Sequence, residues 1–235
     1  MDKTKQNGKT CLVIPHEGKT FEIKYPLFKG VYDDQSTRTY ADVAKQIDKA
    51  GLKRPNSTQV ASLLYYASQN PNRKYGKEII SALRNYQFCE FTGNLQLLKS
   101  NEEISNGIIL DSDSQNLKFD ENGKLIMDKS SLIKRLQEND ENVKFVPYDF
   151  IKLDYPNGFK NNRYMKARYG EEGVEKMAEL IRKYSDHPDW GFWETAPLYG
   201  DVAHISTTLN SGVSLRRSNY SGPCESYSFG IINKK

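Results

Sequence analysis

The sequence predicts a mixed α+β fold, with helices in the first half of the chain and strands mainly at its two ends. Between about residues 39 and 83 the apolar residues recur at helical spacing, whereas residues 11–25 and the C-terminal stretch alternate or carry turn residues. No internal repeat and no regular alternation of strand with helix is visible. The pattern therefore favours segregated helices and antiparallel strands over a parallel sheet built from strand–helix–strand units.

The N-terminal segment predicts a tail followed by a β-hairpin. Residues 1–10 are polar and lysine-rich, which is typical of a loose terminus. Residues 11–15 form a short apolar run, residues 20–25 alternate, and the turn residues 16–19 lie between them. We therefore expect residues 1–38 to form a tail and hairpin ahead of a domain that covers residues 39–235.

Two amphipathic helices are expected next. The first covers residues 40–50, with Thr39 as its N-cap and Gly51 at its end. The second begins after Pro55, with Asn56 or Ser57 as its cap. A third, shorter helix is predicted for residues 78–83.

The middle of the chain predicts shorter elements separated by polar loops. Further strands are expected at residues 86–92, 107–110 and 143–146, and helices at residues 131–137 and 171–184. The last of these has acids in its first turn and bases in its last, which suits the helix dipole. Residues 111–130 and 154–169 are predicted to be mostly loop.

The C-terminal stretch, residues 190–232, has an unusual composition. It holds both tryptophans and few charges, and its polar positions are mostly small side chains, tyrosine and histidine. Rigid aromatics among small polar residues are typical of adaptable binding surfaces. We expect three or four antiparallel strands joined by long loops. The set predicted to form the buried framework is Trp190, Trp193, Phe229 and Ile231.

Composition excludes several functional classes. The net charge of +4 is too mild to demand nucleic acid or an anionic membrane as a partner. Three cysteines without a CxxC pair and three scattered histidines predict neither a metal site nor a cofactor. Because no signal sequence and no long apolar run is visible, the default compartment is the cytoplasm, with display at the cell surface left open.

Three chemical alternatives stay open beside a binding surface. Asp111 and Asp113 begin a segment that is similar to a calcium loop but lacks its glycine, so a solvated loop is favoured. The basic and aromatic residues from Lys160 to Arg168 suit single-stranded nucleic acid, although a solvated loop is favoured there too. Cys224 with His204 is the one pair that suits a cysteine-dependent enzyme.

The order of motifs resembles a known family. Segment 51–59, Gly-Leu-Lys-Arg-Pro-Asn-Ser-Thr-Gln, is similar to a segment that joins an early helix pair in that family. Residues 191–193 (Gly-Phe-Trp), 201–204 (Asp-Val-Ala-His) and 228–231 (Ser-Phe-Gly-Ile) follow in the family's order. The chain thereby resembles C-type-lectin-like domains, in the branch shared by formylglycine-generating enzymes and the variable proteins of diversity-generating retroelements. Among these it looks more like an archaeal variable protein. The arginines of the family pattern near Asp201 and after Gly230 are absent, and the cysteine pair of the enzyme branch has no counterpart.

The resemblance implies a non-enzymatic protein that binds a macromolecular ligand, with protein favoured, through a diversified surface within residues 190–232. In that family the varied positions arise from adenine-directed change, which never produces Trp, Glu, Lys, Met or Gln. The positions expected to vary and to contact the ligand are Phe192, Leu198, Tyr199, Gly200, Asp201, His204, Ser218, Asn219 and Tyr220.

Overall fold

The fold was obtained as a computed structural model, and it belongs to the α+β class. The residues that it describes are 2–6, 9–31, 38–97, 99–121, 125–147, 159–184, 205–206, 212–213 and 225–233. Within them the chain forms five α-helices and three β-sheets.

The described residues contain twelve strands and five α-helices. The strands are β1 (Asp2–Gln6), β2 (Lys9–His16), β3 (Lys19–Val31), β4 (Gln87–Cys89), β5 (Gly93–Leu97), β6 (Gly107–Asp111), β7 (Lys118–Phe119), β8 (Leu125–Ile126), β9 (Val143–Pro147), β10 (Ile205–Ser206), β11 (Gly212–Val213) and β12 (Glu225–Ile231). The helices are α1 (Arg38–Lys49), α2 (Ser57–Ser68), α3 (Lys74–Asn85), α4 (Lys129–Gln137) and α5 (Arg163–Tyr184), with a 3-10 turn, η2 (Phe159–Asn161), before α5.

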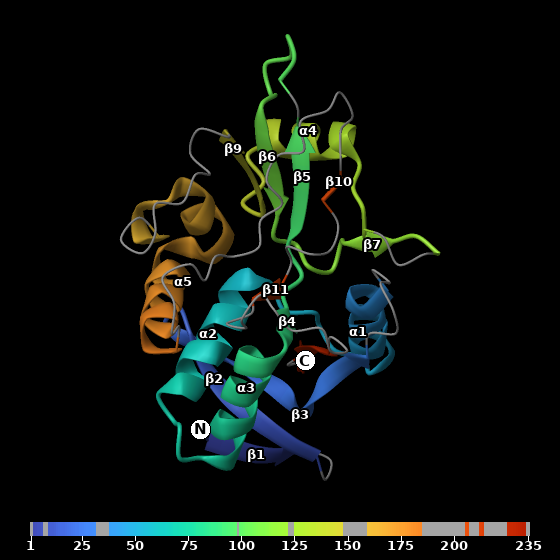
Figure 1. Cartoon of the computed structure of the whole chain (residues 1–235). Coiled ribbons are helices and arrows are strands. Elements are labelled where there is room, and N and C mark those ends of the chain that lie inside the picture. Colours follow the sequence, from blue (N-terminus) through green and yellow to red (C-terminus); the bar gives the residue numbers. More distant parts are fainter. Residues whose placement is uncertain are drawn as a thin grey trace.

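The larger sheet joins the two ends of the chain. Its strand order is β1-β2-β3-β12-β4-β11, so the last strand lies inside the sheet (Figure 1). β12 runs antiparallel to β3 and parallel to β4. The N-terminal hairpin is therefore hydrogen-bonded to the C-terminal strand, while the expected domain boundary at residue 38 stays a prediction.

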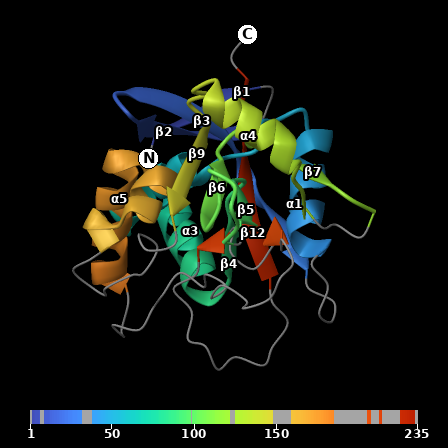
Figure 2. The ribbon, with the colours of Figure 1, turned by 90° about the horizontal axis from the view of Figure 1, so that it is seen from above.

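The two faces of this sheet are covered by different helices, as expected from the alternation of side chains along a strand. Phe229 and Ile231 of β12 face the main core, which α2, α3 and α5 also enter. A second core contains Phe28 of β3 and the apolar face of α1. The helices thus lie on both sides of the sheet, with α5 beside α2 and α1 on the far side (Figure 2).

The four-stranded sheet has the order β10-β5-β6-β9 and packs against α4, and β7 and β8 form a separate two-stranded sheet. β5 is buried along its whole length, and it follows β4 after a gap of three residues. The segment from β4 to β5 therefore belongs first to one sheet and then to the other. We call this segment, residues 87–97, the bridge. The C-terminal strands β10, β11 and β12 all pair with it.

Most of the predicted elements are confirmed, with small shifts at their ends. The hairpin forms, the first helix ends just before Gly51, and Asn56 caps α2 in a reciprocal capping box with Gln59. The third helix begins earlier than expected, at Lys74. The predicted single strand at residues 86–92 is instead β4 alone, because β5 turns away into the second sheet.

The prediction of a loop through residues 154–169 is wrong over its second half. Residues 163–169 form the first two turns of α5, and Tyr164, Met165 and Arg168 are buried there. The helix bends at Gly170, whose φ of 68° lies in the left-handed region that glycine adopts at no steric cost. The polar composition concealed a helix because its buried polar groups pair with one another, as described below.

No helix within the described residues is both long and apolar enough to cross a membrane.

Candidate binding surface

The candidate surface is the C-terminal stretch, and the structure describes its anchoring strands. All nine predicted contact residues, from Phe192 to Tyr220, lie outside the described residues, as do Trp190, Trp193 and the Cys224/His204 pair. What the structure describes is how β10, β11 and β12 attach this stretch to the rest of the chain.

β12 is the buried part of the stretch. The Phe229 side chain is fully buried, with its ring stacked 6.1 Å from Phe21 and tilted 6.2 Å from Phe88, measured between centroids. On the opposite face, Ser228 Oγ donates a hydrogen bond of 3.0 Å to the carbonyl of Cys89. The prediction that Phe229 and Ile231 belong to the framework is confirmed, since Ile231 is also buried.

β10 and β11 attach the stretch to the bridge between the two sheets. β11 pairs with β4, with Gly212 opposite Cys89, and β10 pairs with β5, with Ser206 opposite Asn94. Both are two-residue strands at sheet edges. Two separate points of the C-terminal stretch are thereby tied to one short segment, residues 88–95.

A buried polar cluster lies between these two attachment points. We call it the Glu90 cluster, and its members are Glu90, Asn94, Tyr164, Arg168 and Tyr169. Arg168 Nη2 donates to Glu90 Oε1 at 2.6 Å, and Tyr169 Oη donates to the same oxygen at 2.8 Å. Both charged side chains of the pair are at most 1% exposed.

The cluster continues from the ion pair to β5. Arg168 Nη1 donates to the Tyr164 hydroxyl at 2.9 Å, and that hydroxyl lies 3.4 Å from Asn94 Oδ1. Tyr40 of α1 donates to the backbone carbonyl of Glu90 at 3.0 Å. The bridge is therefore fixed by α5 on one side and by α1 on the other.

The electrostatics of the cluster favour a neutral Tyr169. Burial and the negative charge of Glu90 raise the pKa of Tyr169 well above its ordinary value, so Tyr169 stays a donor. Glu90 Oε2 is also buried, and it has no hydrogen-bond donor within the described residues. Burying a carboxylate oxygen without a donor costs free energy.

Sequence reasoning missed the Glu90 cluster. The available signals were Glu90, an acid within the aromatic segment 86–92, and Arg168, which lies four residues after Tyr164. Neither signal identifies its partner, because Glu90 and Arg168 are 78 residues apart.

A second cluster has the elements of a nucleophilic site. The Ser62 hydroxyl accepts from Lys176 Nζ at 2.9 Å and lies 2.9 Å from His16 Nδ1. Lysine can only donate, so the Ser62 oxygen accepts from Lys176, while Glu17 lies 3.7 Å from the other ring nitrogen of His16. Ser62 is nevertheless 2% exposed and sits inside α2, whose backbone amides are committed to the helix. The cluster ties the hairpin to α2 and α5 and offers no access to a substrate.

In the segment similar to a calcium loop, Asp111 is paired with Arg135. Arg135 Nη1 and Nη2 donate to the two carboxylate oxygens of Asp111 at 2.6 and 3.2 Å. The Asp113 carboxylate accepts from the Gln115 amide and from the Asn116 side chain. Across the described residues, no group of three or more acids, histidines or cysteines is placed to hold a metal ion.

The basic segment from Lys160 to Arg168 is largely neutralised. Lys160 pairs with Glu175, and Lys166 Nζ lies 2.9 Å from Glu171 Oε2. Arg168 is the buried partner of Glu90. Three of the cations proposed for nucleic acid are thus already bound to carboxylates.

The comparisons with known proteins identify no relative. No protein-family model, curated protein or solved structure matches this chain. Its function is therefore inferred from the geometry described above.

Proposed function

We propose that this chain is a non-enzymatic binding protein with a C-type-lectin-like fold, which displays a diversified C-terminal surface to a macromolecular ligand, with protein the favoured class. The observation that carries the proposal is the division of the C-terminal stretch. It has one buried strand inside the main sheet and two short strands at sheet edges.

A display surface needs a scaffold whose stability does not depend on the displayed residues. β12 supplies apolar core through Phe229 and Ile231, and neither residue is among the nine expected to vary. The chain's last strand therefore holds the stretch in place by packing, whatever side chains precede it.

The edge strands supply attachment through the backbone. β10 and β11 pair with β5 and β4 through main-chain hydrogen bonds, which do not specify side chains. In the bridge that they attach to, β5 is buried and Glu90 is held by Arg168 of α5 and by Tyr40 of α1. This arrangement suits a surface whose residues change while its framework stays constant.

The layout of motifs also supports the C-type-lectin-like assignment. Segment 51–59 joins α1 to α2, as the similar segment joins a helix pair in that family. The closing motif 228–231 lies in the last strand, beside β3 from the start of the chain.

Comparative sequencing of the gene in related strains tests the proposal. We expect a near-copy of its 3′ end, differing at adenines, beside a reverse transcriptase gene. Codon changes should be confined to the nine expected positions and should leave Trp190, Trp193 and Phe229 constant. A gene without such a copy, or with changes spread evenly along the chain, would contradict diversification.

A further inference from the structure

Helix α3 carries an exposed row of basic side chains that the proposed function does not use. Arg73, Lys74, Lys77 and Arg84 are all exposed, and Glu78 is the one acid between them. Lys74, Lys77 and Arg84 are separated by three and seven residues, which places them on one face of the helix.

Three of these four cations differ from the lysines described above in lacking an acidic partner within the described residues. Lys160, Lys166 and Lys176 on or before α5 each pair with a glutamate. On α3, Lys74 reaches Glu78 at 4.0 Å, which is the edge of ion-pair range. Within the described part of the chain, the side chains of Arg73, Lys77 and Arg84 have no ion pair. Counted over the described residues, the row therefore carries more positive than negative charge.

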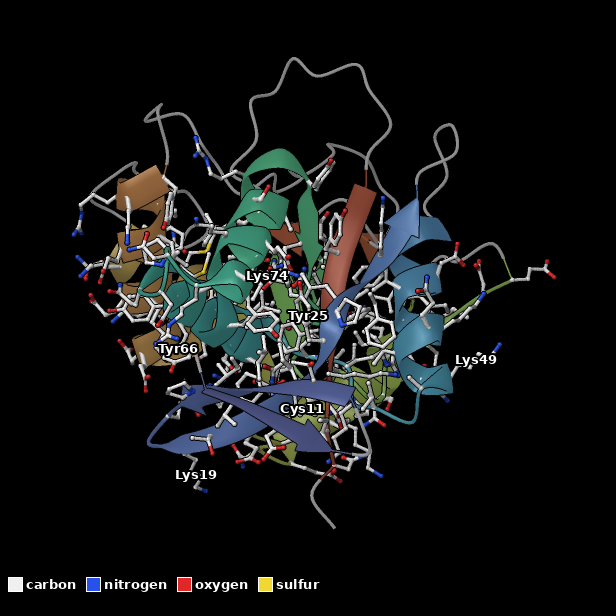
Figure 3. The ribbon with its side chains drawn as sticks, turned by 90° about the horizontal axis from the view of Figure 1, so that it is seen from below. Cys11, Lys19, Tyr25, Lys49, Tyr66 and Lys74 are labelled. Carbon is white, nitrogen blue, oxygen red and sulfur yellow. The ribbon has the colours of Figure 1, made fainter. Side chains whose placement is uncertain are left out.

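Half-buried tyrosines lie at both ends of this helix. At the start, the rings of Tyr75 and Tyr25 meet edge to face at 4.6 Å, and Figure 3 shows Tyr25 close to Lys74. At the end, Tyr86 lies 5.3 Å from Tyr227, measured between ring centroids.

We propose that this surface binds an acidic segment of a partner protein. The α3 surface is defined by Arg73, Lys74, Lys77 and Arg84. The helix from residue 73 to 84 is about 16 Å long, which matches about five residues of extended chain. Carboxylates spaced along such a segment would meet the row of cations in charge-assisted hydrogen bonds.

The aromatic geometry favours protein over single-stranded nucleic acid. Bases stack on free ring faces, but here the rings of Tyr25 and Tyr75 already pack edge to face against each other. Lys29 Nζ lies over the Tyr227 ring, 5.9 Å from its centroid. The basic residues all lie outside residues 190–232, so this inference does not depend on a diversified C-terminal surface.

Binding of fluorescent polyglutamate to the full chain, followed by anisotropy, tests the proposal. At an ionic strength of about 0.01 M, where screening is weak, the wild-type chain should bind. The triple variant Lys74→Gln, Lys77→Gln, Arg84→Gln should bind about tenfold more weakly. The matched control is Lys45→Gln, Lys49→Gln, Lys134→Gln, which removes the same charge from exposed positions on α1 and α4.

The control variant should retain wild-type affinity, and circular dichroism should show both variants folded. If both variants lost the same affinity for polyglutamate, binding would depend on net charge alone, and the proposal would be overturned. Absence of polyglutamate binding by the wild-type chain would also overturn it. Tighter binding of a short oligothymidylate than of polyglutamate would assign the surface to nucleic acid instead.

Discussion

At the scale of single residues, the bridge between the sheets depends on one buried ion pair. Glu90 and Arg168 are both fully enclosed, and Tyr169 shares the same carboxylate oxygen. Two charges in a poorly solvated interior stabilise a fold only while both are present, because a single unpaired charge there is very costly.

Replacing Arg168 by methionine should therefore destabilise the chain by about 3–5 kcal/mol, since Glu90 would be left without its partner. The double variant Glu90→Leu, Arg168→Met should lose less than that single variant, because no buried charge remains. Urea unfolding measures both. Lys166→Met serves as the control, because Lys166 pairs with a largely exposed Glu171, and it should cost less than about 1 kcal/mol. Equal small losses in Arg168→Met and Lys166→Met would refute the role of the pair.

His16 makes stability depend on pH. Burial lowers the pKa of His16 first, and Lys176 lowers it further, against opposite effects of Glu17 and Glu172. The folded chain therefore holds His16 neutral, whereas the unfolded chain protonates it near its ordinary pKa of 6.5. Because the unfolded state then binds more protons, the free energy of unfolding should fall as the pH drops below 6.5.

The measurement is urea unfolding at neutral and mildly acidic pH for the wild-type chain and His16→Asn. Asparagine can still form a hydrogen bond with Ser62 but does not titrate. The difference between the two chains should grow in favour of the variant as the pH falls, which separates His16 from the carboxylates that titrate nearby. A difference that stays constant with pH would contradict this account.

At the scale of elements, β12 is held in place by a close approach. A Cβ added at Gly230 would come within 2.7 Å of Leu52 Cβ, and the backbone of Lys53 bridges to Ile231. The absence of a side chain at Gly230 therefore lets the segment after α1 lie directly against the last strand.

Gly230→Ala should cost about 1–3 kcal/mol, because it overpacks this contact. Leu52→Ala removes the outer atoms of the clash, so the double variant should be less destabilised than the sum of the two single variants. Denaturant unfolding of the four chains gives this coupling. Strict additivity would show that the two residues do not press on one another.

Sequence reasoning succeeded for elements whose signal is local. The cap at Asn56, the hairpin and the amphipathic second half of α5 all follow from neighbouring residues. It failed for the first turns of α5, because Arg168 looks solvated until its distant partner Glu90 is known. It also missed β5 as a separate strand, since no local pattern indicates a change of sheet.

At the scale of the whole molecule, we expect the chain to combine a constant framework with a C-terminal surface that changes. The sheets and helices bury Phe229 and anchor β10 and β11 at neighbouring points of one rigid segment. The central claim is that residues such as Tyr199 and Tyr220 contribute to binding and not to the core. The nine contact positions remain a prediction, because they lie outside the described residues.

The most direct test is the free energy of unfolding of two variants, measured by urea titration. The double variant Tyr199→Ala, Tyr220→Ala should unfold within about 0.5 kcal/mol of the wild-type chain. Phe229→Ala, which empties a fully buried site, should lose about 3–5 kcal/mol. A loss in the tyrosine variant as large as that in Phe229→Ala would place both tyrosines in the core and contradict a display surface.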